Sequence, residues 1–115
     1  MLTYNLSEEI AALHQEEGWR NLGHSAKTLV KHHDSSIVLI AMKQGNGMKE
    51  HRASGAISIQ AIAGRLQVHV GKKTIEVPAG SMLALEREVV HDVEALEDSA
   101  FVLTVGTEPA EPRNR

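Results

Sequence analysis

The chain has 115 residues and a formal net charge of −3, with 42% hydrophobic and 23% charged residues, values typical of one globular domain. The absence of cysteine excludes disulfides and thiolate chemistry. Basic residues are scattered and predict no nucleic-acid partner, and no apolar stretch reaches the roughly 20 residues of a membrane span. The first residues lack the basic flank and apolar run of a signal peptide, so we expect a cytoplasmic protein with no membrane partner.

A short helix is predicted at residues 6–17. Ser7 can cap its start, Glu8 and Glu9 suit the positive end of the helix dipole, and Gly18 can end it. Because a helix of about three turns is marginal in isolation, it must pack against the rest of the domain.

Short strands separated by turn signals follow Gly23. Several of them alternate apolar and polar residues, as Leu66 and Val68 do against Gln67 and His69. Regular short strands with turns predict an all-β sandwich or barrel over residues 24–106, with a frayed polar tail at 108–115. The predicted strands are 27–31, 36–43, 57–63, 65–70, 73–77, 81–85, 90–94 and 100–105.

Residues 37–42 are apolar throughout, which predicts a strand covered on both faces. Either the N-terminal helix or a second copy of the chain could supply the second cover. We expect a homodimer, because a monomer with this face open would expose apolar area to water.

Two spaced motifs lie among the strands. The first comprises Gly45, His51, Ala53, Ile57 and Gly64, and the second comprises Gly80, residues 86–88, His91 and Ala95. Their spacing resembles the two motifs of the cupin superfamily, over about residues 36–105. The resemblance implies one cupin domain over residues 1–115, with a jelly-roll barrel of the double-stranded β-helix type and a short N-terminal helix.

The resemblance also implies where a metal ion would lie. In metal-binding cupins, one ion is held at the positions that are His51, Ala53, Ile57 and His91 here. Alanine and isoleucine cannot coordinate a metal, whereas catalytic sites usually take three ligands from the protein. A third ligand would have to come from Gln60, Glu50 or Glu86. The strand alternation from Ile57 predicts that Gln60 faces away from the barrel unless a bulge reverses it.

The favoured hypothesis is a barrel that binds a small organic molecule without a certain cofactor. His51 and His91 would line the pocket, with Gln60 and Arg52 adding polarity. The alternative is a metal-dependent oxygenase or isomerase that uses Mn, Fe, Ni or Zn on His51, His91 and a non-standard third ligand. The sequence leaves open whether the protein is an enzyme.

The remaining candidates for chemistry have plainer interpretations. A sugar epimerase-like cupin would need a tyrosine acid beside a histidine base, and Tyr4 is the only tyrosine. His69 fits an exposed sheet face. Four further histidines are expected to be exposed polar residues, with His14 on the solvated side of the helix: His14, His24, His32 and His33.

Overall fold

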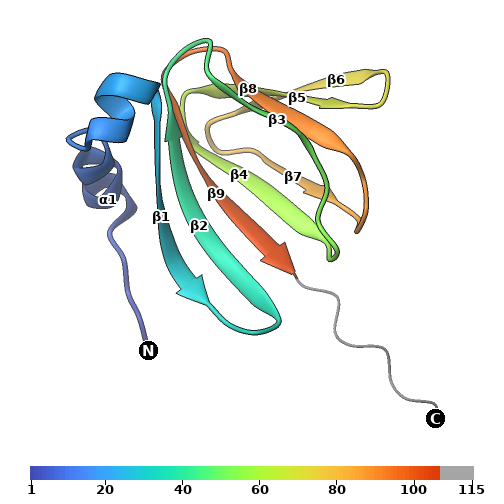
Figure 1. Ribbon diagram of the computed structural model, residues 1–115, viewed down its shortest axis with the longest axis horizontal. Helices are drawn as coiled ribbons and strands as arrows, with labels where there is room; N and C mark the ends of the chain where they lie inside the picture. Colours follow the sequence, from blue (N-terminus) through green and yellow to red (C-terminus); the bar gives the residue numbers. More distant parts are fainter. Residues whose placement is uncertain (107–115) are drawn as a thin grey trace.

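The computed structural model describes residues 1–106, apart from the side chains of Glu50 and His51, and the predicted tail at 108–115 lies outside the described residues. Within this range, nine strands follow two helical segments and form two antiparallel sheets (Figure 1). The larger sheet has the order β1-β2-β9-β4-β7 and the smaller β3-β8-β5-β6. The strands are β1 His24–Lys31, β2 Ser35–Met42, β3 Gly47–His51, β4 Ile57–Ala63, β5 Arg65–Val70, β6 Lys73–Pro78, β7 Met82–Leu85, β8 His91–Ala95 and β9 Ser99–Gly106.

Every predicted strand is present, and one strand was not predicted. β3 begins at Gly47, inside a segment whose glycines indicate a turn, and it pairs only at the edge of the smaller sheet with β8. β1 begins at His24, earlier than predicted, because its ladder with β2 continues to the pair His24↔Met42. Both differences arise from pairing with distant strands.

The inner faces of the two sheets enclose the main core. Leu66 and Val68 of β5 and Phe101 of β9 are each 0% exposed, and Val93 of β8 is 2% exposed. In β5 and β8 these side chains alternate with polar residues on the outer face, as a half-buried antiparallel sheet requires. The structure therefore confirms the predicted all-β jelly-roll barrel.

The N-terminal helix begins at residue 6 as predicted, but its capping residue and its C-terminal end differ from the prediction. The α-helix α1, Leu6–Leu13, is capped by Asn5, whose side chain accepts a hydrogen bond from the Glu8 amide at 3.1 Å, and not by Ser7. A π-helical turn, η1, follows at Gly18–Leu22 and ends at Gly23, whose φ of 84° is left-handed. The helical region thus ends at Gly23 and not at Gly18, the predicted end. No helix in residues 1–106 has the length and apolarity to cross a membrane.

The helix covers the outer face of β2 (Figure 1). Leu39 and Ala41 of β2 are 0% exposed and pack with Leu13 and Trp19 in a second apolar cluster. This confirms the predicted cover on both faces and selects the helix over a second copy. The apolar run in β2 therefore gives no support to a homodimer.

Polar contacts fix the helical segment to β1. The Tyr4 hydroxyl donates to the Leu29 carbonyl at 2.7 Å, and Lys27 Nζ donates to Glu9 Oε1 at 2.7 Å. The hydrogen bond that Lys27 donates to the Glu9 carboxylate raises the pKa of Lys27 above its ordinary value. These contacts hold the helix over the sheet that it covers.

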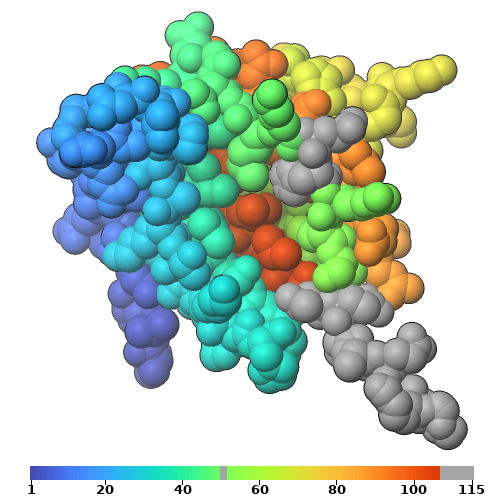
Figure 2. Space-filling model, in the orientation of Figure 1, coloured from blue at the N-terminus to red at the C-terminus, as the bar shows by residue number. Residues whose placement is uncertain are grey.

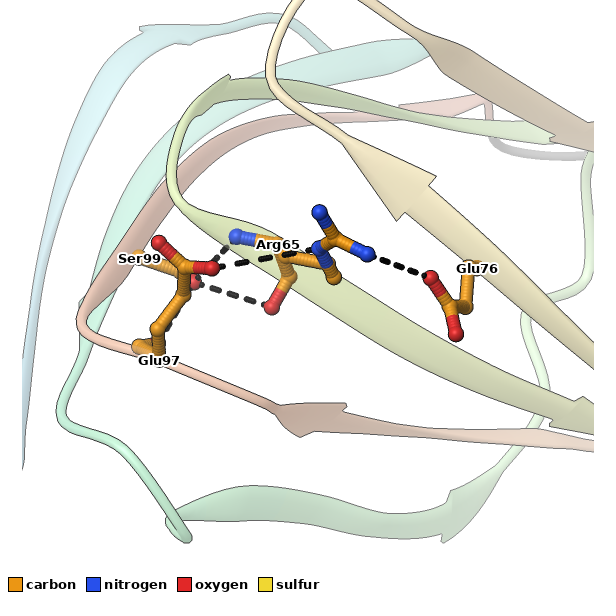
Figure 3. Close-up of polar contacts among 4 residues, drawn as sticks. All are labelled: Arg65, Glu76, Glu97 and Ser99. Atoms are coloured by element: carbon orange, nitrogen blue, oxygen red, sulfur yellow. Dashed lines mark hydrogen bonds and ion pairs between the residues drawn. The ribbon is translucent and has the colours of Figure 1, made fainter.

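A polar corner explains the last glycine of the first motif. Gly64 has φ +77°, and a Cβ there would lie 2.3 Å from the Asp98 carbonyl oxygen. Beside it, Ser99 Oγ accepts from the Arg65 amide at 3.0 Å and lies 2.7 Å from the Glu97 carbonyl (Figure 3). The corner thus requires both a left-handed residue and the absence of a side chain.

Candidate ligand-binding site

The second-motif histidine, His91, lies on the inner face of the smaller sheet. It alternates with Val93 and Ala95 along β8, and all three are buried. His91 is 2% exposed, and its Nδ1 lies 3.0 Å from the Val89 carbonyl oxygen. A carbonyl can only accept, so this contact assigns the proton to Nδ1 in the neutral ring and the lone pair to the buried Nε2.

The two motif histidines are register partners. β3 pairs with β8 so that His51 lies opposite His91, after an irregularity between Met48 and His51. Two histidines far apart in the sequence thus reach neighbouring backbones through a long-range strand pair.

The other two positions of the expected metal site, Ala53 and Ile57, are apolar residues and also lie in apolar surroundings. Ile57 is 6% exposed and belongs to the main core, and the partly buried Ala53 packs against that core. Among the described residues, no group of three or more histidine, cysteine, aspartate or glutamate side chains is arranged to hold a metal ion. The described residues therefore do not fit the ion that the fold family implies.

The remaining predicted site residues do not join His91. Gln60 is exposed on the opposite face of β4 from Ile59 and Ala61, and the bulge in this strand follows Gln60 and does not reverse it. Arg52 is exposed, with its Nε 3.9 Å from Glu88 Oε1, and Glu86 is exposed in the turn before β8. Gln60 is thus excluded from the barrel by strand alternation.

Tyr4 also does not lie where an epimerase-like cupin would need its tyrosine acid. Its hydroxyl donates to the Leu29 carbonyl, and its ring packs with the helix-covered cluster outside the barrel. The general acid that this hypothesis needs is therefore not beside His91.

Partly buried apolar side chains surround the main core where the barrel opens. They include Val38 of β2 and Leu103 and Val105 of β9. Figure 2 shows this side of the molecule, where the orange-red β9 segment is set back between the teal β2 segment and green β3. These partly buried apolar groups therefore border the main core.

Two cavities are lined by residues that the sequence did not single out for binding. One, of about 260 Å³, lies between β1, β2 and β3 and includes His24 in its wall. The other, of about 310 Å³, is a shallow depression on the outer face of the smaller sheet, where His69 Nδ1 lies 2.6 Å from Asp92 Oδ1. His24 is exposed as predicted, but only the pairing of β1 with β2 shows that it borders a cavity.

Among the histidines whose side chains the structure describes, His14 has surroundings that differ from the prediction. It is half-buried and stacks on Trp19, with 4.1 Å between the ring centroids. The predicted helix would place it on a solvated side, whereas the early end of α1 and the following π-helical turn bring Trp19 back over it.

The two facing sheets and the inward motif histidine define a cupin-type barrel. The sequence profile of the AraC-like ligand-binding domain family matches residues 34–111, so the chain belongs to this family. No curated protein matches the chain.

Solved structures support the same fold. A conserved protein of unknown function from Streptococcus pyogenes has 19% identity and a TM-score of 0.79, covering 95% of this chain and 90% of that one. An RmlC-like cupin from Desulfovibrio desulfuricans has 19% identity and a TM-score of 0.74, covering 92% and 96%. A cupin 2 conserved barrel domain protein from Leptotrichia buccalis has 22% identity and a TM-score of 0.77, covering 90% and 47%. At these identities the likeness shows the fold alone.

Proposed function

We propose that this domain binds a small organic molecule inside its barrel, with His91 and His51 at the pocket. The observation that carries the proposal is the placement of His91: an imidazole that is 2% exposed, among the apolar side chains of the inner face. Its Nδ1 is held by the Val89 carbonyl, which fixes the orientation of the ring on this face. The family to which the chain belongs is described as ligand-binding, which supports the proposal.

The chemistry of the site indicates the kind of ligand. With the Nδ1 proton directed at the Val89 carbonyl, Nε2 is the ring nitrogen of His91 that can accept a hydrogen bond. Its complement is a hydroxyl or amide group on the ligand. The apolar side chains at the open side, Val38 and Leu103 among them, favour a ligand whose remaining surface is apolar.

The proposal does not use a metal ion, because Ala53 and Ile57 occupy two of the four positions that would hold it. Metal analysis of protein purified without an affinity tag tests this point. Stoichiometric Mn, Fe, Ni or Zn that disappears in His91→Ala would contradict the proposal and favour a metal-dependent enzyme.

Binding itself is tested by NMR titration of the histidine ring signals with cyclohexanol, phenol and 1,2-butanediol. We expect saturable shifts of the His91 ring signals. His91→Gln should weaken binding by roughly 2- to 12-fold, the range that a hydrogen bond of about 0.5–1.5 kcal/mol supplies. His33→Ala, at an exposed position between β1 and β2, is the matched control and should change nothing. Titrations that leave the His91 signals unmoved would refute the proposal.

We also propose that the domain forms a homodimer through the outer face of β9, β4 and β7. The registers align two rows of uncharged side chains across these strands, and Met82 is 62% exposed. The rows are Val102, Gln60, Met82 and Thr104, Ser58, Ala84. A two-fold dimer brings a face against its own copy, so a face with no charged residue in these rows meets its copy without like-charge repulsion.

Light scattering at micromolar concentration tests the dimer. The wild type should have twice the monomer mass, and Ala84→Glu should be monomeric because it brings like charges together across the two-fold axis. Lys73→Glu, on β6 of the other sheet, should stay dimeric. A monomeric wild type would overturn this part of the proposal.

A further inference from the structure

An apolar groove opens between the edge strands of the two sheets. β1 is the edge of the larger sheet and β3 is the edge of the smaller. The groove has a volume of about 260 Å³ and is lined by His24, Ala26, Ile40, Met42, Gly47 and Met48. Its volume is just below the range of about 300–1,000 Å³ typical of sites for drug-sized ligands, so it suits a smaller molecule.

The strand register explains why apolar surface lies open here. His24 pairs with Met42 and Ala26 pairs with Ile40, so the β1 residues continue the inner face of β2. Met42 is 1% exposed and Ile40 is 8% exposed, whereas Ala26 is exposed. β1 therefore extends the inner face of the larger sheet beyond the part that the smaller sheet covers.

Hydrogen bonds fix the shape of the closed end of the groove. The Lys43 amide donates to the Gly23 carbonyl at 2.8 Å, and Asn46 Nδ2 donates to the Leu22 carbonyl at 3.0 Å. The Asn46 carbonyl accepts from the Ala95 amide at 2.9 Å. Because these bonds tie the start of β1 to the start of β3, the groove is formed before any ligand arrives.

At Gly47, the wall of the groove carries no side chain. A Cβ at this position would lie 2.7 Å from the Val93 carbonyl oxygen, so the packing of β3 on β8 excludes a side chain. The facing walls carry the thioether side chains of Met42 and Met48. Methionine adapts to irregular and planar ligands and makes favourable contacts with aromatic rings.

We infer that this groove binds a small carboxylate with an apolar, ring-sized body. The body would lie between Met42 and Met48, and the carboxylate would accept a hydrogen bond from the imidazole of His24. His24 is exposed, so the charged end of the ligand stays hydrated while its body is buried. A wholly apolar molecule would leave the imidazole unused, and a sugar would place hydroxyls against the methionines.

This site is separate from the one proposed at His91. His24 and Gly47 lie at one end of the groove and of β3, whereas the pair His51↔His91 lies at the other end of β3. At about 3.3 Å per residue, the four steps from Gly47 to His51 span roughly 13 Å. A small carboxylate in the groove therefore does not reach the motif histidines.

Titration with benzoate, followed through the methyl signals of ¹³C-methyl methionine, tests the inference. Ring currents should shift the Met42 and Met48 methyls saturably and leave the exposed Met82 methyl, on the far face of the sheet, unchanged. His24→Ala should weaken benzoate binding by roughly 12-fold, which corresponds to about 1.5 kcal/mol, the lower end of what hydrogen bonds to charged groups contribute, because His24 is exposed. Benzamide, which is uncharged, should bind as weakly to the wild type as benzoate does to His24→Ala.

A variant that fills the groove supplies a second criterion. Ala26→Trp should abolish the benzoate shifts, whereas Ala79→Trp, at an exposed alanine in the turn before β7, should preserve them. Unsaturable shifts at all methionine methyls, or binding unchanged by Ala26→Trp, would overturn the inference. Benzoate shifts confined to the His91 ring signals would also overturn it, and would leave the barrel proposal standing.

Discussion

Rebuilding the two apolar positions of the first motif tests whether the motif positions converge inside the barrel. Ile57 is 6% exposed in the main core, and Ala53 packs against that core. His51 and His91 are register partners. The double variant Ala53→His, Ile57→Glu therefore places three histidines and one glutamate at the positions that hold an ion in metal-binding cupins.

Without metal, the double variant should be less stable than the wild type because a carboxylate replaces a buried isoleucine. An uncompensated buried charge costs about 3–5 kcal/mol. For a domain of this size, about 4 °C per kcal/mol, the Tm should fall by roughly 12–20 °C. A divalent ion at about 1,000 times its Kd stabilises the folded state by about 4 kcal/mol, so it should recover most of the loss.

The assay is thermal unfolding with and without Zn²⁺, Ni²⁺ or Mn²⁺, with EDTA as the metal-free reference. Ile59→Glu is the matched control, because Ile59 is 1% exposed on the same inner face, two residues further along β4. It should lose stability without recovering it on metal addition, and the wild-type Tm should not respond to metal. A double variant that responds to metal no more than Ile59→Glu does would refute the reasoning that the four positions converge.

Two further predictions concern stability and are measured by urea unfolding. Gly71→Ala, with φ +60° and nothing within 4 Å, should cost only the roughly 1–2 kcal/mol of left-handed strain. Gly64→Ala should destabilise the domain by more than this, because it adds a Cβ that would lie 2.3 Å from the Asp98 carbonyl oxygen to the same kind of strain. Equal losses would show that the close contact is unimportant. Ser99→Ala should destabilise the domain by about 1–3 kcal/mol, because Ser99 is 3% exposed and accepts a hydrogen bond from the Arg65 amide. Arg65→Ala should cost at most about 1 kcal/mol, because the ion pair of Arg65 with Glu76 is exposed. A larger loss from Arg65→Ala than from Ser99→Ala would contradict this ranking.

Local pattern alone accounts for most of the fold. Apolar and polar alternation identified β5, and glycines with chain-reversing geometry separated the strands, as Gly64 does at the corner before Arg65. Alternation also predicted the outward position of Gln60, which the structure bears out. These properties depend on each residue and its immediate neighbours, so they can be read without knowing which strands pair.

Tertiary structure decided the features that depend on pairing between distant segments. The helix, not a second copy, covers Leu39 and Ala41, and that choice required α1 to fold back over β2. His24 borders a groove because β1 and β3 are edges of different sheets that face each other. His51 lies opposite His91 in register only because β3, a strand with a turn-like sequence, pairs with β8, a strand far away in the chain, at the edge of the smaller sheet.

The amino-acid order by itself therefore determined an all-β sandwich or barrel, and the resemblance of its two motifs to those of cupins implied a jelly roll in which two of the four metal-ligand positions are apolar. The pairing of strands far apart in the chain decided which histidine positions lie opposite each other. It also decided where apolar surface stays open. The physical reason is that a side chain's direction follows from its own strand, whereas the groups it faces are supplied by strands far away in the chain.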